Sequence, residues 1–172
     1  SCSKDRTVFD DFNCKTSGII SNLKTILDAK NNFSLDIPKH WKTELYIDGS
    51  SSTLTTADTT KQFSKTYLIK ASLIDAKLRL DEVGIQKIKT NLTATKSLKI
   101  IGVTKGTFKN MPAILIRSQS KKPLKKSVLH LYAPLSEMQY FEIEIHCYGA
   151  EAIEKRFCEA INYIYSLKIK EI

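Results

Sequence analysis

The sequence has no apolar run long enough to cross a bilayer, and it is poor in the residues that most enzyme sites use. Only 3 histidines and 4 cysteines occur in 172 residues, and no histidine stands in a recognisable nucleophile-elbow or cysteine-protease context. The 6 glycines form no cluster that could cradle a phosphate. These absences exclude a transmembrane helix and argue against a nucleophilic hydrolase or a nucleotide-binding enzyme.

The composition is that of one ordinary globular domain. A chain of 172 residues with 42% hydrophobic and 26% charged residues buries one substantial core and is short for two. Lysine and arginine number 27 against 18 acidic residues, and the net charge of +9 suits an anionic partner. Arginine, which specific phosphate recognition prefers, is rare beside lysine. The composition therefore argues against a nucleic acid as the partner.

The first residues, Ser1-Cys2-Ser3, resemble the junction at which bacterial lipoproteins are cut, where a small residue precedes the cysteine that carries the acyl chains. On this interpretation Cys2 is the lipid attachment site and the signal peptide has been removed. Residues 1–16 are then a polar tether to the membrane, and residues 17–172 are a single domain. The expected location is the bacterial cell envelope, at the outer membrane or its periplasmic face. The alternative is that Cys2 is an ordinary thiol.

Three further cysteines, Cys14, Cys147 and Cys158, raise the question of a disulfide, which an oxidising compartment favours. If Cys147 ends a strand and Cys158 lies in the next helix, the rise of ~1.5 Å per residue separates them by roughly 12 Å. That exceeds the limit of about 7 Å between the Cα atoms of a disulfide. We therefore expect Cys14 to pair with Cys158, with three free thiols as the alternative.

Hydrophobic periodicity predicts an α+β domain, an antiparallel sheet flanked by helices. Apolar residues three and four apart predict helices over residues 17–30, from Asp81 onward, and over 150–167. Acidic residues at the start of the second helix suit the helix dipole.

Alternating apolar residues predict the strands. A central strand with apolar residues on both faces is expected over 67–74, and residues 42–65 should form a hairpin that turns at Asp48-Gly49, although 53–60 also suits a loop. The remaining strands, over 33–37, 98–104, 111–117, 127–133 and 138–147, include a four-strand meander. Its turns are expected at Lys105-Gly106, Lys122-Pro123 and Pro134-Leu135.

Residues Phe33 to Trp41, which read FSLDIPKHW, resemble the opening strand of the PsbP-like family, which ends in a proline and a tryptophan. The stretch from Phe157 to Lys168 is similar to the last helix of that family. The family is named for an extrinsic subunit of photosystem II and includes many bacterial lipoproteins of unknown role. The resemblance covers residues 30–170, and His40 departs from it by replacing the usual glycine. It implies an αβα sandwich that binds or assembles other proteins, and it carries over no catalytic residues.

A candidate ligand or metal face lies on the two strands before the last helix. By alternation His130, Glu142, Glu144 and His146 can point to one face, and imidazole and carboxylate are ligands that zinc accepts. A hairpin that turns near Pro134 would place His130 beside Tyr140 or Glu142, with His146 further along. The alternative is a polar sheet face with ordinary cross-strand pairs.

A second candidate site is the lysine-rich turn formed by Lys121, Lys122, Lys125 and Lys126, which could bind an anion. The alternative is a solvated turn that discourages edge pairing. No aromatic residues are interleaved with these lysines, which argues against single-stranded nucleic acid.

These observations favour a non-enzymatic envelope lipoprotein whose domain binds another envelope protein, as a monomer and without a cofactor. The second interpretation is a small-ligand or metal-binding domain that uses the face around His130 and Glu144. A hydrolase with an unfamiliar site is the third.

Overall fold

The computed structural model describes residues 6–15, 20–120 and 122–170. The helices are α1 (Glu82–Thr90), the π-helical turn η1 (Asn91–Thr95) and α2 (Ile153–Ile164). The strands are β1 (Leu23–Leu27), β2 (Phe33–Pro38), β3 (Lys42–Ile47), β4 (Ser51–Ala57), β5 (Leu68–Ile74), β6 (Lys99–Phe108), β7 (Met111–Ser120), β8 (Lys126–Ser136), β9 (Gln139–Tyr148) and β10 (Lys168–Ile169).

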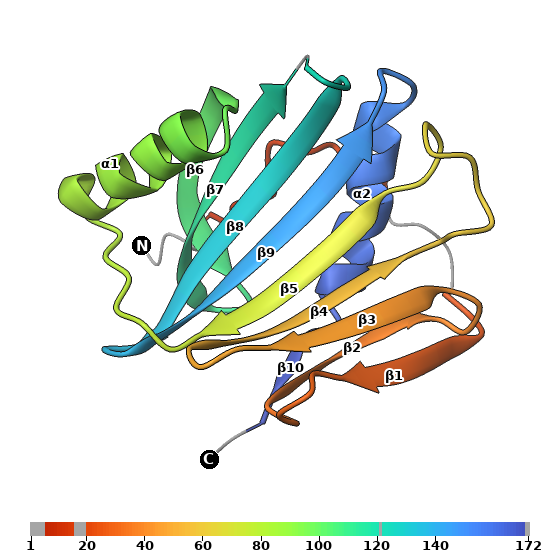
Figure 1. The fold of residues 1–172 in the computed structure, drawn as a ribbon, viewed down its shortest axis with the longest axis horizontal. Helices are drawn as coiled ribbons and strands as arrows, with labels where there is room; N and C mark the ends of the chain where they lie inside the picture. Colours follow the sequence, from red (N-terminus) through yellow and green to blue (C-terminus); the bar gives the residue numbers. More distant parts are fainter. Residues whose placement is uncertain (1–5, 16–19, 121, 171–172) are drawn as a thin grey trace, which may run out of the picture.

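Seven strands form one antiparallel sheet in the order β3-β4-β5-β9-β8-β7-β6 (Figure 1). The half from β6 to β9 is the predicted meander, in which each strand pairs with the next along the chain. β5 lies inside the sheet between β4 and β9, which confirms its prediction as a central strand. A small second sheet has the order β1-β2-β10.

The two α-helices lie on opposite faces of the large sheet (Figure 1). The buried stripe of α2 joins the main core, as its 3.6-residue spacing predicts: Phe157, Ala160, Ile161 and Ile164. α1 and η1 cover a smaller cluster on the other face: Ile85, Ile88, Leu92, Leu98, Ile114, Ile116 and Tyr132. The domain is therefore an α+β fold with helices on both faces of an antiparallel sheet.

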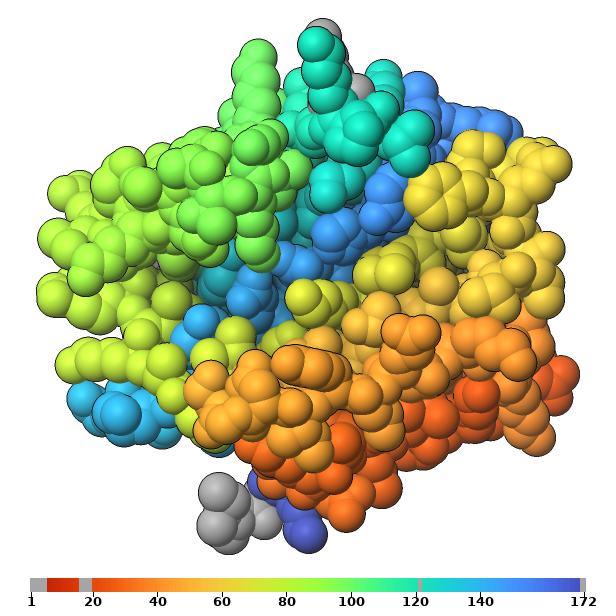
Figure 2. Space-filling view, viewed as in Figure 1, coloured from red at the N-terminus to blue at the C-terminus, as the bar shows by residue number. Residues whose placement is uncertain are grey.

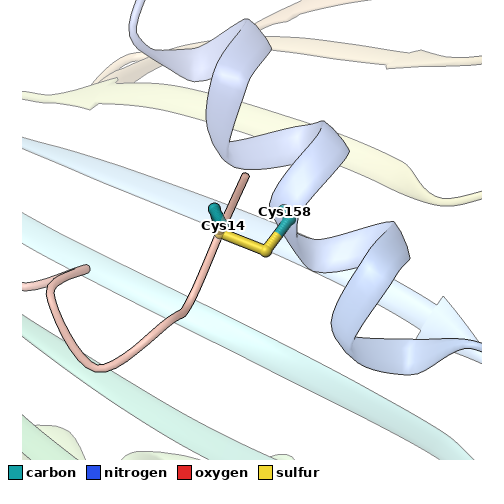
Figure 3. The surroundings of a disulfide bond; sticks show 2 residues. All are labelled: Cys14 and Cys158. Atoms are coloured by element: carbon teal, nitrogen blue, oxygen red, sulfur yellow. A yellow bond between two sulfur atoms is a disulfide. The ribbon is translucent and has the colours of Figure 1, made fainter. Parts of the chain in front are cut away.

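The segment before β1 is attached to the domain instead of serving as a tether over residues 6–15. Val8 and Phe9 are buried in the main core, and a disulfide joins Cys14 to Cys158 with 5.2 Å between the Cα atoms (Figure 3). This is the pairing that helix geometry predicts. Cys2 lies outside the described residues.

The helix predicted over residues 17–30 is wrong, because residues 23–27 form β1 and pair with β2. The apolar spacing fits either structure, and the hairpin turn decides between them. Asp28 is buried, and its carboxylate accepts hydrogen bonds from the backbone N–H groups of Asn32 at 2.6 Å and Phe33 at 2.9 Å. Asn31 has a positive φ of 58°, so the chain reverses and returns as β2.

Two predicted turns are also wrong. Lys105-Gly106 lies inside β6, and the chain turns at Lys109 and Asn110, both of which have positive φ. Gly106 is needed for close approach, since an added Cβ would lie 2.3 Å from the carbonyl oxygen of Arg6. Pro134 lies inside β8 beside a register shift, and β4 extends through residues 53–57, where a loop was the alternative.

Candidate functional site

The face of the large sheet that α1 partly covers carries two polar rows, which the strand register brings together. One row runs across five strands: Tyr46, Thr53, Ser72, Glu142 and Tyr132. The next row lies two residues along each strand: Glu44, Thr55, Lys70, Glu144 and His130. Because side chains alternate along a strand, both rows point to the same face.

Small-molecule pockets have volumes of about 300–1,000 Å³, and an open trench on this face has a volume of about 350 Å³. Its lining includes Tyr46, Thr55, Lys70, Lys96 and Glu142. In Figure 2 it is the hollow between α1 and η1, in green, and β3 and β4, in orange. The trench leaves the polar half of this sheet face accessible.

α1 and η1 cover the other half of the face and place Lys96 beside Glu144. The helix begins at a cap, where the Asp81 carboxylate accepts a hydrogen bond from the Gly84 N–H at 2.9 Å. Leu92, which is fully buried, fixes η1 against the sheet, and Lys96 directly follows this turn. The apolar residues of α1 therefore position a cation at the end of the polar rows.

Glu144 is the centre of the polar network. Its Oε1 accepts a hydrogen bond from Lys96 Nζ at 2.9 Å and lies 3.5 Å from His130 Nδ1. Its Oε2 lies 3.1 Å from His146 Nε2. Glu142 Oε1 is 3.8 Å from the same Lys96 ammonium. His130, in turn, shares a hydrogen bond of 2.8 Å between its Nε2 and Ser118 Oγ.

Burial and charge set the protonation of these groups in opposite directions. Burial favours the neutral form of Glu144, but its contacts with His130, His146 and Lys96 outweigh burial and hold its pKa well below the usual range. Burial, with the negative charge of Glu144 close by, raises the pKa of Glu142. Burial lowers the pKa of His130 despite the nearby carboxylate, so this imidazole is neutral at pH 7. The site therefore has one firmly ionised carboxylate, paired with one ammonium.

The structure brings the four predicted residues of this face together more closely than expected. His130 lies opposite Glu144, not beside Tyr140 or Glu142, because β8 runs on to Ser136 with a register shift after Pro134. His146 is the next residue on the same face of β9, so it reaches Glu144 as well. One ligand atom each from His130, Glu142 and Glu144 lies within 4.8 Å of the others.

Sequence reasoning missed two cations and a hydroxyl of the site. Lys70 is a charged residue within the otherwise largely apolar central strand β5, and this charge could have indicated a polar site on the sheet face. Lys96 and Ser118 gave no signal, because each reaches the network from a different element.

The predicted anion-binding loop connects β7 and β8, the two strands that carry Ser118 and His130. Lys122 and Lys125 are exposed and Lys126 is half-buried at the start of β8, while Lys121 lies outside the described residues. No ion pair joins the described lysines of this loop to an acidic group, and anion binding by the loop stays a prediction.

Comparisons with solved structures identify the fold. The yeast Ran-binding protein Mog1p matches with a TM-score of 0.58 at 8% identity, over 86% of this chain and 95% of that one. Cyanobacterial PsbP (CyanoP) from Synechocystis matches with a TM-score of 0.54 at 13% identity, over 91% of this chain and 98% of that one. A protein from Bacteroides thetaiotaomicron matches with a TM-score of 0.51 at 12% identity, over 87% of this chain. The present chain spans only 49% of that protein.

No protein-family model matches the sequence, and no curated protein matches it significantly. Nor is any helix within the described ranges long and apolar enough to cross a membrane. The chain has the PsbP and Mog1 fold, which confirms the PsbP-like architecture predicted from the sequence.

Proposed function

We propose that this chain is a lipoprotein of the bacterial envelope, anchored through Cys2, whose domain binds an extended segment of another envelope protein and catalyses no reaction. The observation that carries the proposal is the open edge of β3. This strand ends the large sheet, and among the described residues only β4 pairs with it. An open edge offers unpaired backbone N–H and C=O groups to an added strand.

The side chains of β3 are those of a contact surface. Leu45, Tyr46 and Ile47 are 48%, 63% and 47% exposed, three successive large apolar residues on an edge strand. An exposed apolar edge strand favours association unless charge or proline protects it. Tyr46 also borders the trench, so a strand added at β3 could place side chains there.

The opposite edge of the same sheet, β6, is covered at one end. Thr7 bridges to Thr107 on β6, the Val8 N–H donates to the Thr107 carbonyl at 3.0 Å, and the Thr107 N–H donates to the Arg6 carbonyl at 3.0 Å. The chain thus covers the end of β6 at Thr107 with its own N-terminal segment, whereas no described segment outside the sheet pairs with β3. The yeast protein with this fold is a Ran-binding protein, so the fold also serves protein recognition elsewhere.

A serine, a histidine and a glutamate do line up in the site, and their burial argues against catalysis. Ser118, His130 and Glu144 have the order of a hydrolase triad, but Ser118 and His130 are both 0% exposed. A nucleophile must reach its substrate. The free cysteine of the described residues, Cys147, is also wholly buried, and burial raises the pKa of its thiol to about 12. These groups therefore support a structural network.

The test is crosslinking in the native host of the full-length precursor, followed by identification of the proteins that co-purify. We expect one reproducible envelope partner, lost with Tyr46→Lys, which adds a charge at the open edge, and kept with Val83→Lys. Val83 is a matched control because it is 55% exposed on α1, away from β3. A partner retained by Tyr46→Lys would refute binding at β3, and an unacylated Cys2 would refute the anchor.

Divalent-metal binding at Glu144 is a second candidate function, and His130 supports it. Its Nδ1 is buried, has no hydrogen-bond partner in the described residues, and lies 3.5 Å from Glu144 Oε1. Zinc bonds of about 2.0–2.1 Å in a tetrahedral site place neighbouring ligand atoms at about 3.3 Å. Together with Glu142, these residues offer three ligand atoms to a metal ion. In the structure the positive charge beside Glu144 is the ammonium group of Lys96, which a metal ion would replace.

This second function predicts competition between zinc and Lys96. Zinc should raise the melting temperature of the unmodified chain, raise that of Lys96→Gln further, and leave His130→Ala unchanged, each compared with its own metal-free sample. Equal zinc shifts in all three proteins would place the metal elsewhere.

A further inference from the structure

A second polar pocket, of about 450 Å³, lies between the β4–β5 connection and the start of α2, which Figure 1 shows side by side. Four cationic and two acidic side chains line it: Lys61, Lys65, Lys155 and Arg156, with Glu151 and Glu159. None of these six takes part in an ion pair within the described residues. The lining therefore carries a net positive charge that no internal pair neutralises.

Arg156 is the unusual member, because it is a buried cation that forms no ion pair with any described residue. It is 3% exposed, and its guanidinium is fixed by two backbone carbonyls: Nε donates to Glu151 and Nη1 to Thr66, both at 2.9 Å. Its Nη2 has no hydrogen-bond partner in the described residues. Buried charges in proteins are normally paired, since an unpaired one is costly. A bound anion would supply the missing partner.

The start of α2 adds to the positive potential. The residue before the helix, Ala152, has a positive φ of 47° and a side chain that cannot cap, so the first-turn N–H groups from Ile153 onward lack a side-chain acceptor. α2 is 12 residues long, and its N-terminal end carries the positive end of the helix dipole. Helix N-termini with free N–H groups bind phosphate and sulfate.

We propose that this pocket binds a phosphoryl group. The uncapped N-terminus of α2 and the fixed guanidinium of Arg156 would hold its oxygens, and Lys65 and Lys155 would neutralise its remaining charge. A phosphoryl group fits this set better than a single carboxylate, because the set has several separate donors and more than one unpaired cation. Free phosphate esters and phospholipid headgroups share this chemistry. The inference is independent of partner binding at β3.

The experiment is a titration of the full chain with inorganic phosphate at low ionic strength in a non-phosphate buffer, followed by the backbone amide signals of α2. We expect saturable shifts at Ile153, Glu154 and Lys155. The double variant Lys65→Gln/Lys155→Gln should bind about tenfold more weakly, while the matched variant Lys30→Gln/Lys105→Gln should bind like the unmodified chain. Both control lysines are exposed and lie outside the pocket.

Glu159→Gln removes a negative charge from the pocket and should strengthen binding severalfold, an outcome that damaged folding cannot produce. Non-saturating shifts, or equal weakening in both lysine double variants, would overturn the proposal. Vesicles of phosphatidylglycerol, with phosphatidylcholine as reference, separate the two sources. Binding to the former that phosphate displaces indicates a headgroup site, and phosphate binding without vesicle binding indicates a soluble ligand. Saturation by neither probe also overturns the proposal.

Discussion

Replacing Glu144 with glutamine is the sharpest test of the polar network, because this carboxylate contacts Lys96, His130 and His146 at once. Removing one member of a buried ion pair costs about 3–5 kcal/mol when the partner stays buried. Glu144 is 5% exposed, but the Lys96 side chain is 38% exposed and can turn to water. We therefore expect Glu144→Gln to lower the free energy of unfolding by about 2–3 kcal/mol at pH 7.

The pH dependence of this loss has a definite sign. The pKa of Glu144 is lowered in the folded chain, whereas the unfolded chain protonates it near the ordinary value of about 4.3. Its contribution is therefore complete above about pH 4.3 and is lost as the pH falls further toward the folded pKa. Glutamine does not titrate, so the difference between the two proteins should shrink below about pH 4.3.

Urea unfolding followed by circular dichroism, at pH values from 3 to 7, measures both quantities. Glu137→Gln is the matched control, because Glu137 also lies near a lysine, Lys77 at 3.6 Å, but its side chain is 89% exposed. It should leave stability unchanged within error. A Glu144→Gln protein as stable as the unmodified chain at pH 7, or a loss that does not depend on pH, would refute the network as described.

Three further predictions concern the scaffold. Cys14→Ser should lower stability by about 2–5 kcal/mol, and a reductant should lower the unmodified chain to the same level without affecting the variant; no effect of reductant would contradict this. Gly84→Ala should lower the free energy of unfolding by about 1–3 kcal/mol, because the new Cβ would lie 2.0 Å from the Arg79 carbonyl oxygen. Gly49→Ala is the control: its Cβ would meet nothing within 4 Å, so stability in the same urea assay should not change. Leu92→Ala should cost about 2–5 kcal/mol by leaving a cavity under η1, and a smaller loss would mean that η1 is not fixed by packing.

The parts of the fold that local periodicity determines could be predicted from the sequence. The alternation of Phe141, Ile143 and Ile145 with Glu142 and Glu144 fixes both the strand and the face that meets the main core, since a slip of one residue would turn the carboxylates into that apolar core. The last helix follows from its apolar stripe in the same way. The disulfide partner of Cys158 followed from the rise per residue of a helix, because that rise places Cys147 too far away and leaves Cys14.

The parts that depend on turns and distant contacts could not be predicted. The sequence of residues 17–30 has a helical spacing, but the buried Asp28 and the positive φ of Asn31 form a hairpin, so tertiary pairing overrides periodicity. The register of β8 against β9 depends on a local shift near Pro134, and that shift determines which residue faces His130. Lys96 reaches Glu144 across 48 residues of sequence, and no local pattern encodes such a contact.

The attached N-terminal segment limits where the domain can lie if Cys2 is acylated. A tether of sixteen residues would have left the orientation of the domain free. Because Arg6 already bonds to Thr107 on β6, only three residues separate it from Cys2, and the four Cα–Cα steps between them span at most about 14 Å. A lipid anchor would therefore hold the β6 edge of the sheet close to the membrane surface.

This geometry connects the anchor to the proposed binding edge. β3 and β6 are the two ends of a seven-stranded sheet, six strand spacings of about 4.8 Å apart, or roughly 29 Å. Residues 6–8 pair with the end of β6 nearer the anchor, at Thr107, and the far edge exposes Leu45, Tyr46 and Ile47. An anchor at β6 thus presents β3 away from the bilayer, where an extended segment of a partner protein can reach it. Moving the anchor to the C-terminus, which follows β10 at the other sheet, should therefore weaken partner capture even though the β3 surface itself is unchanged.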